Sequence, residues 1–72
     1  MEHLKKRSFT LSGHRTSLAL EPEFWEALEV LAEARGLSLA GLVANIDAVR
    51  AGRPLASACR VAILAGRFAR PR

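Results

Sequence analysis

The stretch HRTSLALEPEFWEAL, residues 14–28, changes its hydrophobic period halfway along, next to a proline. From Arg15 to Leu20 polar and apolar residues alternate, as in a strand with one buried face. The apolar-facing set is Thr16, Leu18 and Leu20, and the opposite set is Arg15, Ser17 and Ala19. After Pro22 the apolar residues recur at helical spacing. A chain of 72 residues with one clear strand must find a partner for that strand, since a single strand leaves its backbone groups unpaired.

Three helices are predicted after the strand. Pro22 suits the first position of a helix, and Gly36 suits the left-handed residue that ends it. Ser38 is a typical N-cap for a second helix, which Gly52 and Pro54 then end. The segment LASACRVAILAG predicts a third helix from about residue 55 to residue 66.

The charges are unevenly distributed. The net charge is +4 and the isoelectric point is near 10.7, which favours an anionic partner. The first 20 residues are basic, residues 21–35 are acidic, and a second basic region follows. We therefore divide the chain into a flexible basic arm (1–13), a core (14–51), and a C-terminal helix with a basic tail (52–72).

The simplest partner for the strand is the same strand of a second copy, paired antiparallel about a two-fold axis. This predicts a mainly α fold, in which a shared ribbon packs on two core helices and a third helix is added. The expected dimer core is Thr16, Leu18, Leu20, Phe24, Leu28, Leu31, Leu42, Val43 and Ile46. Trp25 lies off the centre of the first helix's apolar face, so we expect it to pack on another chain.

A two-stranded ribbon fits the major groove of B-DNA. The segment RTSLALEPEFWEALEVLAEARGLSLAGLVA resembles the ribbon-helix-helix family, the Arc- and MetJ-type DNA-binding proteins, over roughly residues 15–50. The longer pattern KRS, GHRTS, LEPEFWEAL and GLSLAGLVANID, with a following LASACRVAIL-type segment, is similar to a small bacterial subgroup of that family. The resemblance implies a homodimeric transcriptional regulator, expected to be a repressor.

The resemblance also implies roles for particular residues. The outward strand residues Arg15, Ser17 and Ala19 would contact bases, although Ala19 offers only a methyl group. Ser38 and Leu39, at the start of the second helix, would bind a phosphate through backbone N–H groups. The arm would add phosphate contacts through Lys5, Lys6 and Arg7, which confer salt dependence without sequence information.

Other classes of function find little support in the sequence. His3, His14 and Cys59 do not have the spacing of a metal site, and no serine lies in a nucleophile motif. We therefore expect no enzyme activity, no metal and no cofactor. A lone cysteine indicates a small buried thiol. Without a signal peptide or a long apolar run, the expected location is the cytoplasm, with no membrane partner.

One alternative stays open. The same scaffold would serve as a protein-interaction adaptor, or as an antitoxin-like module, if the apolar third helix and Trp25 dock a partner protein. The basic C-terminal tail would then add at most weak contacts with DNA phosphate.

Overall fold

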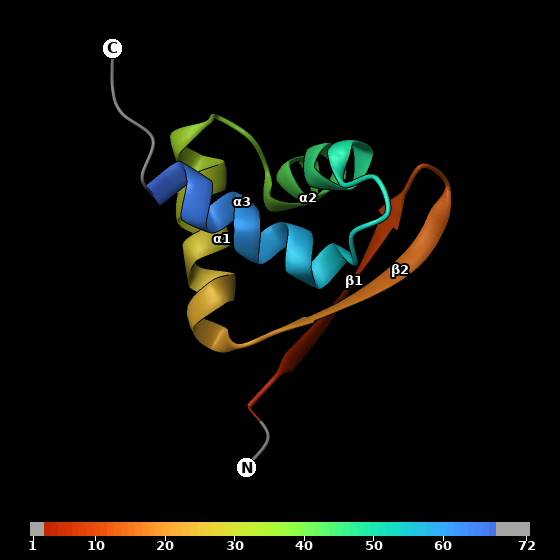
Figure 1. Ribbon diagram of the computed structural model, residues 1–72, viewed down its shortest axis with the longest axis horizontal. Helices are drawn as coiled ribbons and strands as arrows, with labels where there is room; N and C mark the ends of the chain where they lie inside the picture. Colours follow the sequence, from red (N-terminus) through yellow and green to blue (C-terminus); the bar gives the residue numbers. More distant parts are fainter. Residues whose placement is uncertain (1–2, 68–72) are drawn as a thin grey trace.

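The computed structural model describes residues 3–67 and arranges them as a two-stranded sheet followed by three helices (Figure 1). Strand β1 spans Lys5–Leu11 and strand β2 spans His14–Leu20. Helix α1 spans Pro22–Ala34, α2 spans Leu39–Val49, and α3 spans Leu55–Arg67. The hairpin packs against the helices, with β1 against α2 and β2 against α1 and α3.

The two strands form an antiparallel hairpin within one chain, and this corrects the expectation of an unpartnered strand and a flexible arm. The two-residue turn consists of Ser12 and Gly13, whose φ angles are 50° and 81°. Left-handed φ values at both central residues are those of a type I′ turn, whose twist matches that of the flanking strands. Residues 5–11 thus supply the ribbon partner that we expected from a second copy.

The helix boundaries follow the capping signals in the sequence. Pro22 opens α1, and Gly36 takes a left-handed φ of 69° just after it. The Oγ of Ser38 accepts a hydrogen bond from the backbone N–H of Gly41, so Ser38 is the N-cap of α2. The third helix forms where it was predicted. After α2 the left-handed residue is Ala51, with φ 57°, one position before Gly52.

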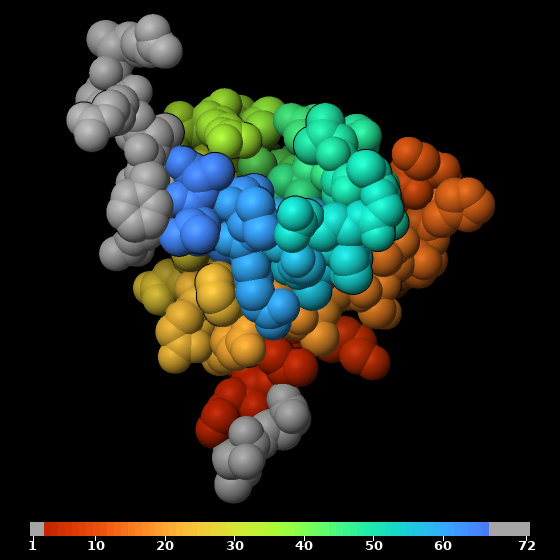
Figure 2. Space-filling view, in the orientation of Figure 1, coloured from red at the N-terminus to blue at the C-terminus, as the bar shows by residue number. Residues whose placement is uncertain are grey.

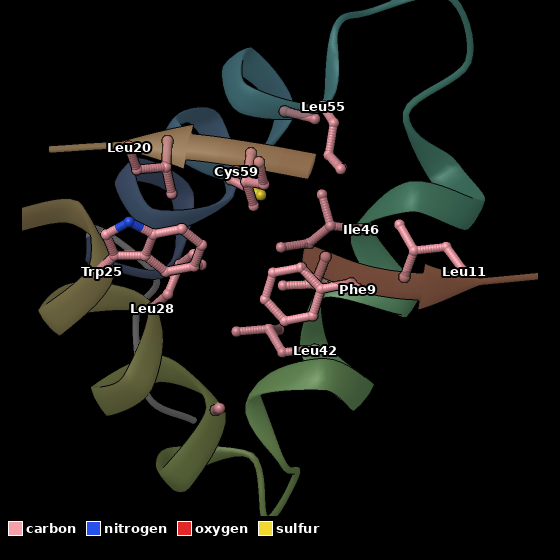
Figure 3. Packing of buried hydrophobic residues seen from close by; sticks show 13 residues of the cluster. Phe9, Leu11, Leu20, Trp25, Leu28, Leu42, Ile46, Leu55 and Cys59 are labelled. Atoms are coloured by element: carbon pink, nitrogen blue, oxygen red, sulfur yellow. The ribbon is translucent and has the colours of Figure 1, made fainter. Parts of the chain in front are cut away.

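A single apolar core lies between the hairpin and the helices (Figure 3). Of the residues predicted for a dimer core, six are buried within one chain: Leu18, Leu20, Leu28, Leu42, Val43 and Ile46. Thr16, Phe24 and Leu31 are half-buried. Phe9 and Leu11 from β1, and Leu55, Ala58 and Cys59 from α3, complete the cluster. The buried Cys59 agrees with the prediction, and its pKa is raised to about 11 because burial disfavours the thiolate.

Trp25 lies inside this core, which corrects the expectation that it packs on another chain. Its side chain is 3% exposed, and its ring stacks with that of Phe9 at 6.0 Å between centroids. The indole N–H donates to the backbone carbonyl of Lys5 at 2.8 Å. Trp25 therefore joins α1 to β1 within one chain, and it is not available for docking a partner protein.

Candidate nucleic-acid interface

The outward face of the hairpin carries side chains from both strands. In the antiparallel register Lys6 lies opposite Ala19, Ser8 opposite Ser17, and Thr10 opposite Arg15. Side chains alternate between the two faces of a strand, and the residues between these six point toward the helices. Ala19 is half-buried and the other five residues are exposed. The hairpin face, as we call these six residues from here on, is therefore a continuous surface.

The hairpin face is basic and rich in hydroxyl groups. Lys6 and Arg15 make no ion pair among the described residues, and no carboxylate is present on this face. Ser8, Thr10 and Ser17 add hydroxyl groups that can donate or accept a hydrogen bond. Free cations beside hydroxyls suit an anionic ligand that also presents hydrogen-bonding groups.

Arg7 belongs to the other face of β1 and has a structural role. Its guanidinium lies over the ring of Trp25, 4.6 Å from the centroid, and its Nη1 is 3.3 Å from a carboxylate oxygen of Glu29. Such cation–π stacking stabilises by about 0.5–1 kcal/mol at exposed sites. The predicted phosphate-binding set Lys5, Lys6 and Arg7 is therefore divided: Lys6 lies on the hairpin face, and Lys5 and Arg7 do not.

The end of β2 is held against α3 by Arg60. Its Nη2 donates to Glu21 Oε1 at 2.9 Å, and its guanidinium lies 5.3 Å from the ring centroid of Phe24. The hydrogen bond from Arg60 is the main reason why the pKa of Glu21 is lowered. Arg60 is thus engaged with α1, while Lys6 and Arg15 remain available.

The start of α2 provides free backbone donors beside the exposed Ser38. The Ser38 side chain already bonds Gly41, and the N–H groups of Leu39 and Ala40 have no acceptor among residues 3–67. Such donors at the positive end of a helix dipole suit a phosphate group. The geometry at the start of α2 is compatible with the predicted phosphate-binding role of Ser38 and Leu39.

The order of the elements and the basic hairpin agree with one known domain. A sequence model of the ribbon-helix-helix domain matches residues 4–66. The chain belongs to the ribbon-helix-helix family. The match begins just before β1 and ends within α3, so it includes the first strand and the added helix. No curated protein and no solved structure is significantly similar to the chain.

This match confirms the predicted family and the ribbon-helix-helix fold with an added third helix. The family is one of DNA-binding regulators. Within residues 3–67 there is no group of three or more histidine, cysteine or acidic side chains placed to hold a metal ion. None of the described helices is both long and apolar enough to cross a membrane.

Ser8 and Thr10 are candidate interface residues that sequence reasoning missed. The signal was present, because SG is a polar-glycine pair between two runs that each include alternating residues. The expectation was instead a flexible arm that leads into a turn at SG, with part of KRSFTLS able to extend as β. Had SG been interpreted as a hairpin turn, the register would have placed Thr10 beside Arg15.

Proposed function

We propose that this ribbon-helix-helix protein is a sequence-specific transcriptional regulator, acting as a repressor, that inserts its hairpin face into the major groove of DNA. The observation that carries the proposal is the register: it places two free cations and three hydroxyls on one exposed ribbon without a carboxylate. A two-stranded ribbon fits a major groove about 12 Å wide. In this proposal the protein works in the bacterial cytoplasm, where it would meet DNA.

Each residue of the hairpin face has a chemical role in this proposal. Arg15 can donate two hydrogen bonds to the O6 and N7 atoms of a guanine, which is the commonest specific contact in the major groove. Ser17 and Thr10 add shorter hydrogen-bonding groups beside it, and the methyl of Ala19 suits a thymine methyl. Lys6, near the open end of the hairpin, suits a phosphate, as do the free N–H groups at the start of α2.

The test combines selection from a random duplex library with a matched pair of arginine variants. Selection at about 50 mM and 200 mM salt separates phosphate-driven affinity, which falls steeply with salt, from base recognition. Arg15→Ala removes a free cation from the hairpin face, whereas Arg7→Ala removes a cation from the opposite face of the same ribbon.

We expect Arg15→Ala to weaken binding to the selected duplex by about 5- to 150-fold, which corresponds to 1–3 kcal/mol, and to relax the preference at one base pair. Arg7→Ala should lower the stability of the fold and leave that preference unchanged. Lys6→Ala should weaken binding to every sequence alike and reduce the salt slope by about 1. Absence of an enriched motif, or equal effects of Arg15→Ala and Arg7→Ala on base preference, would refute the proposal.

A further inference from the structure

Helix α3 has an outward side that the rest of the described chain leaves uncovered. Val61 is 45% exposed and Leu64 is 55% exposed, although both are large aliphatic residues. Together with Ser57 they recur at spacings of four and three, so they form one line along the helix. This is the spacing by which two helices pack side by side. Figure 2 shows α3 crossing the front of the molecule, between α1 and the end of α2.

The surface beside α3 is hollowed on both sides. Between α1 and α3 lie two hollows of about 410 and 340 Å³, which share Ala27 and Ile63 as lining residues. A third hollow of about 220 Å³ lies between α2 and α3, and Val61 lines both it and the first. Val30, which is 61% exposed, belongs to the same surface. We call this surface, which carries the exposed side chains of Val30, Val61 and Leu64, the α3 face.

The two margins of the α3 face have opposite charge. On one margin, the exposed carboxylate Glu23 lines the hollow between α1 and α3 and makes no ion pair among the described residues, whereas Arg60, which lines the same hollow, is paired with Glu21. On the other margin, Arg50 and Arg53 line the hollow between α2 and α3. Arg50 is bonded to Asp47, whereas the guanidinium of Arg53 is exposed and bonded to the hydroxyl of Ser57. The surface therefore has an unpaired carboxylate on one margin, apolar side chains between, and on the other margin a guanidinium that makes no ion pair among the described residues.

Such a surface is complementary to itself. If two copies meet face to face about an axis that runs along α3, the acidic margin of each lies against the basic margin of the other. The same rotation brings Val61 and Leu64 of one copy against Val61 and Leu64 of the second. Single exposed aliphatic residues are ordinary on a protein surface, but here three of them share a hollowed surface.

We propose that the chain forms a two-fold dimer through the α3 face, in which the α3 helices of two copies lie side by side and parallel. This dimer differs from the one predicted from sequence, in which two copies share a ribbon. The α3 face includes none of the six residues of the hairpin face, so this dimer and the proposed DNA binding can be tested separately.

The first experiment is sedimentation equilibrium of the full chain over a dilution series. Leu64→Glu places a charge on the α3 face, and we expect it to raise the dimer dissociation constant at least tenfold. Ala44→Glu is the matched control, because Ala44 is exposed on α2 and lines none of the three hollows. It should leave the dissociation constant unchanged. Circular dichroism of both variants confirms that they fold.

The second experiment tests the orientation of the two copies. In a Cys59→Ala background, Leu64→Cys should form a disulfide between copies under mild oxidation, because the axis places the two thiols near each other. Ala44→Cys should not. A native chain that stays monomeric throughout the dilution series overturns the proposal, as does a dimer that Leu64→Glu leaves intact. Equal crosslinking of the two cysteine variants overturns it as well.

Discussion

The indole Nε1 of Trp25 donates a hydrogen bond to the backbone carbonyl oxygen of Lys5, 2.8 Å away, and so ties the first helix to the first strand. Phe9 stacks beside the same indole, and Arg7 lies over it. Three contacts from one side chain therefore hold β1 in place. Because β1 supplies half of the hairpin face, Trp25 positions that face without belonging to it.

Trp25→Phe should lower the free energy of unfolding by about 1–2 kcal/mol, because it removes the donor and leaves a partly buried carbonyl without its partner. Urea denaturation followed by circular dichroism measures this change. Phe9→Leu is the comparison, since it removes the ring stacking but retains the hydrogen bond. Unchanged stability of Trp25→Phe would show that the bond contributes nothing to holding β1.

The ion pair between Glu21 and Arg60 predicts that the stability of the fold falls at acidic pH. The pKa of Glu21 is lowered from its ordinary value of 4.5, chiefly by the hydrogen bond from Arg60. A carboxyl with a lowered pKa in the folded state stabilises the fold above its unfolded pKa, and this contribution is lost as the pH falls through the folded pKa. Glu21→Gln should therefore flatten the decline in stability below pH 4.5.

Thermal denaturation between neutral and acidic pH measures that slope. Glu33→Gln is a suitable control, because Glu33 is exposed and makes no ion pair among the described residues. If both variants show the same slope, the contact between Glu21 and Arg60 does not stabilise the fold.

The buried thiol of Cys59 predicts that the stability of the fold falls at alkaline pH. Its pKa is raised from 9.0 to about 11 by burial, so the unfolded chain releases this proton at a lower pH than the folded chain. The folded state is favoured fully below pH 9, and this contribution is lost as the pH rises from 9 to 11. The loss amounts to about 2–3 kcal/mol at 1.36 kcal/mol per pKa unit.

Two measurements check the Cys59 prediction. The decline in stability above pH 9 should be shallower for Cys59→Ala than for the native chain, and alkylation of the thiol should be slow until the chain is denatured. Rapid alkylation of the native protein at neutral pH would contradict the burial of Cys59.

The N-cap of α2 predicts that replacing Ser38 lowers the stability of the fold. Ser38→Ala removes the acceptor for the N–H of Gly41 and should cost about 1 kcal/mol, or roughly 4–8 °C in Tm for a domain of this size. Ser38→Asp should retain the cap and gain from the helix dipole. Differential scanning calorimetry distinguishes the two, and equal values of Tm would exclude a capping role.

Much of the fold could be predicted from the sequence because its signals are local. Pro22, Gly36 and Ser38 mark helix ends through their own backbone geometry or side chains, and the structure confirms each of them. The alternation from Arg15 to Leu20 predicted β2 and the side to which each residue points.

The first strand does not follow from hydrophobic periodicity alone, because its inward face is not uniformly apolar. Phe9 and Leu11 are buried, but the next inward residue along the strand is Arg7, a charged residue. The guanidinium of Arg7 lies over the indole ring of Trp25, which is 18 residues further along the chain, and this contact holds Arg7 in place. A contact of this kind is tertiary, so neither β1 nor the burial of Trp25 follows from periodicity alone.

The turn at Ser12 and Gly13 has a consequence for how this ribbon can change over evolution. A ribbon built from two identical copies repeats every substitution, since one codon specifies both strands. Here β1 and β2 are encoded separately, and their outward residues already differ: Lys6, Ser8 and Thr10 on one strand, and Arg15, Ser17 and Ala19 on the other. Each position of the ribbon can therefore be substituted independently during evolution, and the two strands need not present the same side chains.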